Sequence, residues 1–355
     1  MFLFANAHVA SGHTRLTSGL KMGSRANLVI VKNRGFSLYF CHWCARTLPG
    51  ALFWGPAYVR SYIEQQSEED KEHWLDTIWA EGGVVLDEDR QLLLLYGGEE
   101  LLVNIPLRRL YLQLMRLNWP GWELRWAGQG ILDMAHYVGV PLALVTGEDT
   151  DEKQAAVMRM PTDEARINWM GTVRFADKTV WIYPLAGFAQ VWYFLKRGED
   201  LLDMAGRERQ IQAYDMTEWS DRFPSGGFHI DVPAQSITYW QARDLSKHRE
   251  IQSKWPNWQL NFVGDRFEVQ RELAEGNLIF PKVDSAKLLQ ELKGILLPGV
   301  EPDPSESLRR IVEEKEEVGW EMSVAPTAWH HAPLKISLEA KKRIWARAIL
   351  SLAEA

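Results

Sequence analysis

Residues Glu81–Tyr96 read EGGVVLDEDRQLLLLY, and residues Ser225–Trp240 read SGGFHIDVPAQSITYW. Without a gap, the two stretches share a glycine pair, an aliphatic residue, an aspartate, a glutamine and a second aliphatic residue. Further along, WPGWEL at Trp119–Leu124 matches WPNWQL at Trp255–Leu260. Upstream, Leu28–Tyr39 aligns more weakly with the segment that ends at Tyr183. Three blocks in the same order predict two tandem pseudo-repeats.

Each copy is predicted to combine strands and helices. Short apolar runs joined by Gly- or Asp-containing turns indicate paired strands. Pro56 and Pro106 are expected to open helices, because proline is preorganised for the first helical position. The apolar residues between Trp74 and Trp79 indicate another helix. We therefore predict an α+β fold of ββ-α-α-ββ-α-β-α type with mainly antiparallel sheets.

The domain organisation follows from these copies. We expect a loose leader at 1–21, the first repeat at 22–145, a polar linker at 146–167, the second repeat at 168–275 and a helical C-terminal appendage at 276–355. Helical periodicity supports the appendage, which we expect to pack on the second copy. The start, Met1–Ala7, lacks the basic region and long apolar run of a secretory signal. Met1 and Met22 are both candidate starts.

Composition narrows the function classes. The chain has 40 Lys and Arg against 47 Asp and Glu, which gives a net charge of −7. An acidic chain is poorly suited to a phosphate backbone, so we expect no nucleic-acid partner. No run approaches the roughly 18 apolar residues that a membrane span needs, and two cysteines fit a reducing compartment. We expect a soluble, cytoplasmic protein whose partner is another protein of basic charge.

Tryptophan is unusually frequent, with 17 residues against 13 Phe and 10 Tyr. The most distinctive repeated pairs are Trp119 with Trp122 and Trp255 with Trp258. Large aromatic rings serve both packing and recognition. Each pair therefore has two interpretations, a clamp between a helix end and a strand, or a stacking surface for a sugar, a base or a peptide.

Glu81 and Asp87 are the candidate acidic residues near these rings. Paired carboxylates can perform general acid–base work, and carboxylates beside aromatic rings suit a carbohydrate-like ligand. Asp231 recurs at the position that matches Asp87. Because aspartate also caps backbone N–H groups in turns, the turn interpretation of Asp87 stands beside the binding one.

Two further motifs have interpretations that involve no chemical function. Cys41-His-Trp-Cys44 has the spacing of a redox dithiol or of half a zinc site, but the chain has no second cysteine pair. We interpret the two cysteines as packing residues. His330 and His331 lie outside any helical metal-binding motif, so we read them as loop residues. The sequence predicts neither a metal nor a cofactor.

Two functions from different classes remain. The first is a non-catalytic binding protein, such as an adaptor or the neutralising partner of another protein, and it rests on the acidic charge and the tryptophan excess. The second is an enzyme or small-ligand protein that uses a groove between the two copies. The sequence leaves open whether any reaction is catalysed.

Overall fold

Two mixed β-sheets organise the chain, one in each of two units. The computed structural model describes residues 23–147, 156, 158, 167–186, 190–207, 211–217, 223–243, 247–298, 303–320 and 322–353. Unit 1 takes in the described residues up to Gly98, then Tyr111–Gly147, and those from Gln290 onward. Unit 2 takes in Glu99–Leu110 and the described residues between Glu148 and Leu289. The predicted leader and most of the predicted linker lie outside the described residues.

The sheet of unit 1 has the strand order β3-β2-β1-β4-β5-β6. β1 and β2 form an antiparallel hairpin, as do β4 and β5, whereas β1 runs parallel to β4 and β5 parallel to β6. Its strands are β1 (Ala26–Lys32), β2 (Gly35–Cys41), β3 (Ser67–Glu69), β4 (Gly82–Asp87), β5 (Leu92–Tyr96) and β6 (Glu123–Trp126).

The sheet of unit 2 has the order β12-β11-β10-β7-β8. Its hairpins β7–β8 and β10–β11 are antiparallel, while β7 runs parallel to β10 and β11 parallel to β12. The strands are β7 (Ile167–Arg174), β8 (Val180–Ala186), β10 (Gly226–Asp231), β11 (Ser236–Gln241) and β12 (Gln259–Phe262). A separate pair joins β9 (Tyr214–Asp215) to β13 (Leu278–Ile279). The expected α+β class is confirmed, but the sheets are mixed rather than mainly antiparallel, because helical connections return the chain in the parallel sense.

Helices cover both sheets. Unit 1 holds α1 (Leu48–Leu52), α2 (Pro56–Ile63), α5 (Ile131–Val138), η1 (Leu142–Leu144), α11 (Pro304–Glu317), η3 (Pro326–Trp329) and α12 (Leu338–Ala353). Unit 2 holds α3 (Glu99–Val103), α6 (Val191–Leu195), α7 (Asp200–Arg207), α8 (His248–Lys254) and α9 (Phe267–Leu273). The division between the units falls within α4 (Ile105–Arg116) and α10 (Ser285–Leu296). Pro56 begins α2 as expected.

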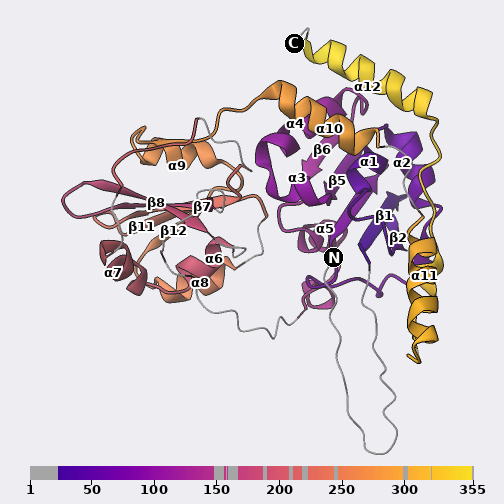
Figure 1. The fold of residues 1–355 in the computed structure, drawn as a ribbon, viewed down its shortest axis with the longest axis horizontal. Helices are drawn as coiled ribbons and strands as arrows, with labels where there is room; N and C mark the ends of the chain where they lie inside the picture. The colour runs from indigo at the N-terminus through magenta and orange to yellow at the C-terminus, as the bar shows by residue number, and fades with distance from the viewer. Residues whose placement is uncertain are drawn as a thin grey trace, which may run out of the picture. The chain divides into compact units, whose positions relative to one another are not determined.

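Alternation along the strands of unit 2 separates two apolar layers. Trp169 and Tyr239 pack in one cluster with Phe194 of α6 and Trp255, whereas their strand neighbours Met170 and Trp240 pack in another with residues of α9. Successive side chains of a strand point to opposite faces of a sheet, so each face receives its own helices. Figure 1 shows α9 on one side of this sheet and α6, α7 and α8 on the other.

Both glycine pairs permit close helix packing. A Cβ on Gly227 would lie 2.6 Å from the carbonyl oxygen of Met170 and would overlap Oε1 of Gln270 in α9. A Cβ on Gly83 would lie 3.0 Å from the carbonyl oxygen of Asn27 and would overlap Sδ of Met134 in α5. In each sheet the second glycine therefore sits where a helix crosses the strand with no space for a side chain.

A buried polar network lies beneath α9. The amide nitrogen of Gln270 donates to the carbonyl oxygens of Phe228 at 2.7 Å and Met170 at 2.9 Å, and its Oε1 accepts from Nε1 of Trp240 at 2.6 Å. Nδ1 of His229 lies 3.0 Å from the hydroxyl of Thr172. Burial, aided by the positive charge of Arg174, lowers the pKa of His229 to about 4. The imidazole is therefore neutral in the folded unit at neutral pH.

Arg108 is a charged residue of unit 2 with only 1% of its surface exposed. Its guanidinium donates to the carbonyl oxygen of Ala242 at 2.8 Å, to that of Leu101 at 3.2 Å and to Oδ2 of Asp265 at 2.8 Å. Burial favours protonation of Asp265, but the hydrogen bond and charge of Arg108 outweigh it and lower the pKa of that carboxyl. The pair joins α4 to the chain that enters α9.

Two expectations about helices are corrected. Residues 70–80 form turns rather than a helix, because the carboxylate of Asp76 caps the backbone N–H groups of Ile78 and Trp79. The C-terminal helices do form, but the described chain from Gln290 onward belongs to unit 1 rather than to unit 2. Trp345 of α12 packs against Phe53, with ring centroids 6.1 Å apart.

Candidate functional site

The predicted tryptophan pair of unit 1 lies inside the fold. Trp119 is 1% exposed, and its Nε1 donates to the carbonyl oxygen of Leu52, the last residue of α1, at 3.1 Å. Trp122 packs edge-on against it with centroids 5.2 Å apart. The first ring thereby satisfies a carbonyl group at a helix end that would otherwise lack a partner.

The pair of unit 2 has the same geometry. Trp255 is fully buried and donates from Nε1 to the carbonyl oxygen of Leu195, the last residue of α6, at 2.7 Å. Trp258 packs edge-on against it at 4.9 Å and donates to Oε1 of Glu199 at 3.0 Å. This geometry favours the clamp interpretation of both pairs. A stacking role for these rings stays a prediction.

Glu81 and Asp87 lie at opposite ends of β4. At about 3.3 Å per residue the strand separates them by about 20 Å, so one small ligand does not contact both. Glu81 is exposed and accepts from the backbone N–H of Arg25 at 2.8 Å. Asp87 is buried and accepts from the backbone N–H of Arg90 at 2.9 Å and from the hydroxyl of Tyr137 at 2.6 Å.

Asp231 makes the matching turn in unit 2. Its Oδ1 accepts from the backbone N–H of Ala234 at 3.0 Å, as Oδ1 of Asp87 does from Arg90. Burial, together with the hydrogen bond to Asp87, raises the pKa of Tyr137 to about 12. The neutral phenol therefore remains a donor at neutral pH. The groove expected between the copies stays a prediction.

Cysteine, histidine, tyrosine and lysine side chains instead line one pocket of unit 1, which has a volume of about 80 Å³. We call it the thiol pocket. A single water needs roughly 10–15 Å³ on the same scale, so the pocket has room for several water molecules or a small polar group. Its wall consists of Cys41, Trp43, Cys44, Thr47, Gly50, Ala51, Tyr62, Gln66, Ile295, Leu296, Pro298, His330, His331, Ala332, Pro333, Leu334 and Lys341.

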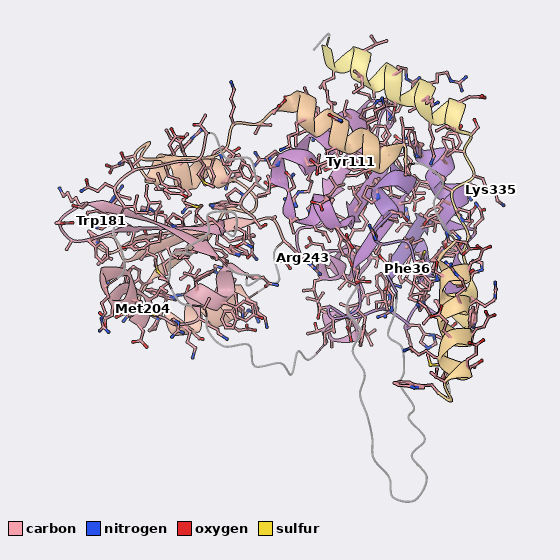
Figure 2. The ribbon with its side chains drawn as sticks, viewed as in Figure 1. Phe36, Tyr111, Trp181, Met204, Arg243 and Lys335 are labelled. Carbon is pink, nitrogen blue, oxygen red and sulfur yellow. The ribbon has the colours of Figure 1, made fainter. Side chains whose placement is uncertain are left out.

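Distant parts of the chain build this wall. Cys41 is the last residue of β2 and Tyr62 lies in α2, whereas residues 330–334 follow η3 near the C-terminus. Lys335, labelled in Figure 2, continues that segment toward α12. Three hydrogen bonds hold the segment in place: Nε1 of Trp43 to the carbonyl oxygen of Ala328 at 2.8 Å, Nε2 of Gln66 to that of Ala332 at 3.0 Å, and His330 to that of Gln65 at 3.0 Å.

The two thiols have unlike environments. Burial alone would raise the pKa of Cys41, but hydrogen bonds to its sulfur from the Cys44 side chain, the Trp43 N–H and the Tyr62 hydroxyl outweigh it, and the pKa falls below that of an ordinary thiol. Burial raises the pKa of Cys44 well above that value, and the neighbouring Cys41 raises it further. Cys41 is therefore the thiol that ionises first.

The wall residues that the structure describes include basic side chains and no acidic ones. Lys341, His330 and His331 are basic, and none of these described wall residues is an aspartate or a glutamate. Nδ1 of His331 lies 3.3 Å from a carboxylate oxygen of Asp303, outside the wall. Within the described part of the chain, no group of three or more His, Cys, Asp or Glu side chains is arranged to hold a metal ion. The wall is suited to a small group with negative charge.

Only part of this site is visible in the sequence. Cys41, Cys44 and the two histidines form recognisable motifs, whereas Tyr62 and Lys341 do not. No local signal connects these residues, because α2 and α12 meet the cysteines only through folding. The spacing of two cysteines by two residues was the one available signal.

Comparison with known proteins adds no family assignment. The chain matches no protein-family model, no curated protein and no solved structure. Among the residues that the structure describes, no helix is both long enough and apolar enough to cross a membrane.

Proposed function

We propose that this chain is a binding protein and that an anionic group, of a small ligand or of a partner protein, enters the thiol pocket. The observation that carries this proposal is the one-sided charge of the wall. Lys341 supplies an ammonium group, and His330 and His331 supply ring nitrogens, with no carboxylate among the described wall residues. An ammonium group contributes more in a confined site than in open water, because fewer water molecules screen it.

Aromatic and polar wall residues support the same proposal. Nζ of Lys341 lies 5.6 Å from the ring centroid of Trp54, which restrains the side chain near the pocket. Tyr62 and Thr47 add hydroxyl groups to the wall. The pocket volume of about 80 Å³ suits one carboxylate or phosphate group rather than a whole large ligand.

Calorimetric titration with inorganic phosphate tests this proposal. Lys341→Met should weaken binding about five-fold, since one charge–charge contact contributes about 1 kcal/mol. Lys342→Met is the matched control, because Lys342 is exposed on the same helix and does not line the pocket. Equal affinities of the two variants, or no binding by the unchanged chain, would refute the pocket as an anion site.

We also propose that the two units descend from one duplicated module. The five-strand orders and directions agree, and the clamps of Trp119 and Trp255 bond to the last residues of α1 and α6. Gln91 and Gln235 both have a positive φ, 52° and 46°, at matching turns. An experimental structure tests this, and failure of β1-β2-β4-β5-β6 to superimpose on β7-β8-β10-β11-β12 would count against it.

A second candidate function is association with a basic protein in the cytoplasm. The net charge of −7 supports it, and α11 exposes Glu306, Glu313, Glu314, Glu316 and Glu317 against three basic residues. Surface charge of this kind accelerates encounter with an oppositely charged partner. Polylysine at low ionic strength is the probe. Neutralising Glu316 and Glu317 should weaken its binding more than neutralising Asp70 and Glu72, and equal effects would refute this surface.

A further inference from the structure

Cys41 ends β2, Cys44 follows three residues later, and both line the thiol pocket. Hydrogen bonds from the Cys44 side chain, the Trp43 N–H, the Tyr62 hydroxyl and the Cys44 N–H outweigh burial and lower the pKa of the Cys41 thiol. Hydrogen bonds to a charged group are stronger than those to a neutral one, so these groups stabilise a thiolate.

We infer that Cys41 and Cys44 form a redox-active dithiol whose substrate is a low-molecular-weight disulfide that carries carboxylate groups. The preference for carboxylates rests on the proposed anion site, whereas the exchange reaction does not depend on it. Both cysteines are free thiols and both line the thiol pocket.

The two cysteines have different roles. Both cysteines are buried, with 7% of Cys41 and 4% of Cys44 exposed, and the pKa of Cys41 is the lower of the two. Tyr62 stays protonated, because burial and the two nearby sulfurs raise its pKa, and it therefore remains a donor to Cys41. Cys44 retains its proton until Cys41 has reacted. This arrangement separates an attacking thiolate from a resolving thiol.

The reaction proceeds in two exchanges. The Cys41 thiolate attacks one sulfur of the substrate R–S–S–R, a bond forms between the two sulfurs, and RS⁻ leaves with the electron pair of the broken S–S bond. Cys44 then gives its proton to RS⁻ and attacks Sγ of Cys41, which expels a second RS⁻. The products are the Cys41–Cys44 disulfide, one RSH and one RS⁻, so the protein dithiol is oxidised and the substrate disulfide is reduced to two thiols.

The first experiment treats the full, native chain with glutathione disulfide and follows its intact mass. We expect a loss of two hydrogen atoms per chain with no adduct. Cys44→Ser should instead retain one glutathione adduct on Cys41, and Cys41→Ser should react at least ten-fold more slowly. A native chain whose cysteines react only after unfolding in denaturant would overturn the inference, and this result requires no variant to fold.

The second experiment separates the substrate class from the exchange itself. Glutathione disulfide is anionic and cystamine is cationic, so Lys341→Met should slow the first about five-fold and should not slow the second, which the lysine repels. Lys342→Met should alter neither. Equal slowing of both probes would overturn the carboxylate preference and the anion site together. Phosphate binding without any thiol exchange would overturn the dithiol and leave the anion site standing.

Discussion

Replacing Gly227 with alanine tests the close packing of α9 on the sheet of unit 2. The added Cβ would lie 2.6 Å from the carbonyl oxygen of Met170 and 2.8 Å from Nε1 of Trp240, and would overlap Oε1 of Gln270. The Met170 carbonyl belongs to β7, which is paired in register with β10 and does not move alone. Gln270 can withdraw only by breaking its hydrogen bonds to Phe228, Met170 and Trp240.

The magnitude follows from these contacts. Overpacking a closed core costs about 1–3 kcal/mol, and each buried hydrogen bond that is lost adds about 1 kcal/mol. We therefore expect Gly227→Ala to lower the free energy of unfolding by about 3–5 kcal/mol. For a unit of this size, a loss of 1 kcal/mol lowers the transition temperature by about 2–4 °C, so the expected decrease is about 10 °C.

Differential scanning calorimetry measures this decrease. The matched control is Gly206→Ala in α7, where a Cβ meets nothing within 4 Å, and alanine there should stabilise the helix by about 0.5–1 kcal/mol. If the transition temperature of Gly227→Ala lies within about 2 °C of that of the unchanged chain, the close packing of α9 is refuted.

Three further predictions concern other residues. The pKa of His229 is about 4 in the folded unit and about 6.5 when unfolded, so the unfolded chain binds the proton first as the pH drops. The free energy of unfolding therefore falls between pH 6.5 and pH 4, by at most about 1.4 kcal/mol per pH unit. Denaturant unfolding at pH 7 and pH 5 should show a smaller decrease for His229→Asn than for the unchanged chain. Arg108→Met removes the donor of three hydrogen bonds, to Ala242, Leu101 and Asp265, and should cost about 2–4 kcal/mol in the same assay, against about 1 kcal/mol or less for the more exposed Arg109→Met. Trp119→Phe and Trp255→Phe remove equivalent indole hydrogen bonds, and thermal unfolding should show similar losses of about 2–4 kcal/mol; a large loss for only one of them would contradict the equivalence of the clamps.

The strands were predictable from sequence because their signals are local. The glycine pairs and aliphatic runs of the two quoted stretches lie in β4, β5, β10 and β11, and the Asp-initiated turns join these strands in pairs. The prediction of a helix near Trp74 was wrong, because apolar spacing alone does not distinguish a helix from turns that bury the same rings. The carboxylate of Asp76 decides in favour of turns by capping nearby N–H groups.

The packing of the C-terminal helices was not predictable in the same way. An amphipathic pattern indicates that one face is buried, but not which surface covers it. Trp345 packs on Phe53, a residue from the opposite end of the chain. The thiol pocket was hidden for the same reason, since Cys41 was visible in the sequence whereas Tyr62 and Lys341 become its neighbours only after folding.

Residues 330–341 are synthesised well after the strands of unit 1, so they join the fold of that unit later than its strands. The β-strands of unit 1 leave the ribosome long before the segment that completes the wall beside Cys41. Until that segment arrives, Trp43 and Gln66 lack their acceptors on Ala328 and Ala332. A chain that stops before Ala328 would therefore lack the part of the wall that residues 330–334 and Lys341 supply, and the thiol pocket would stay open to oxidants in solution.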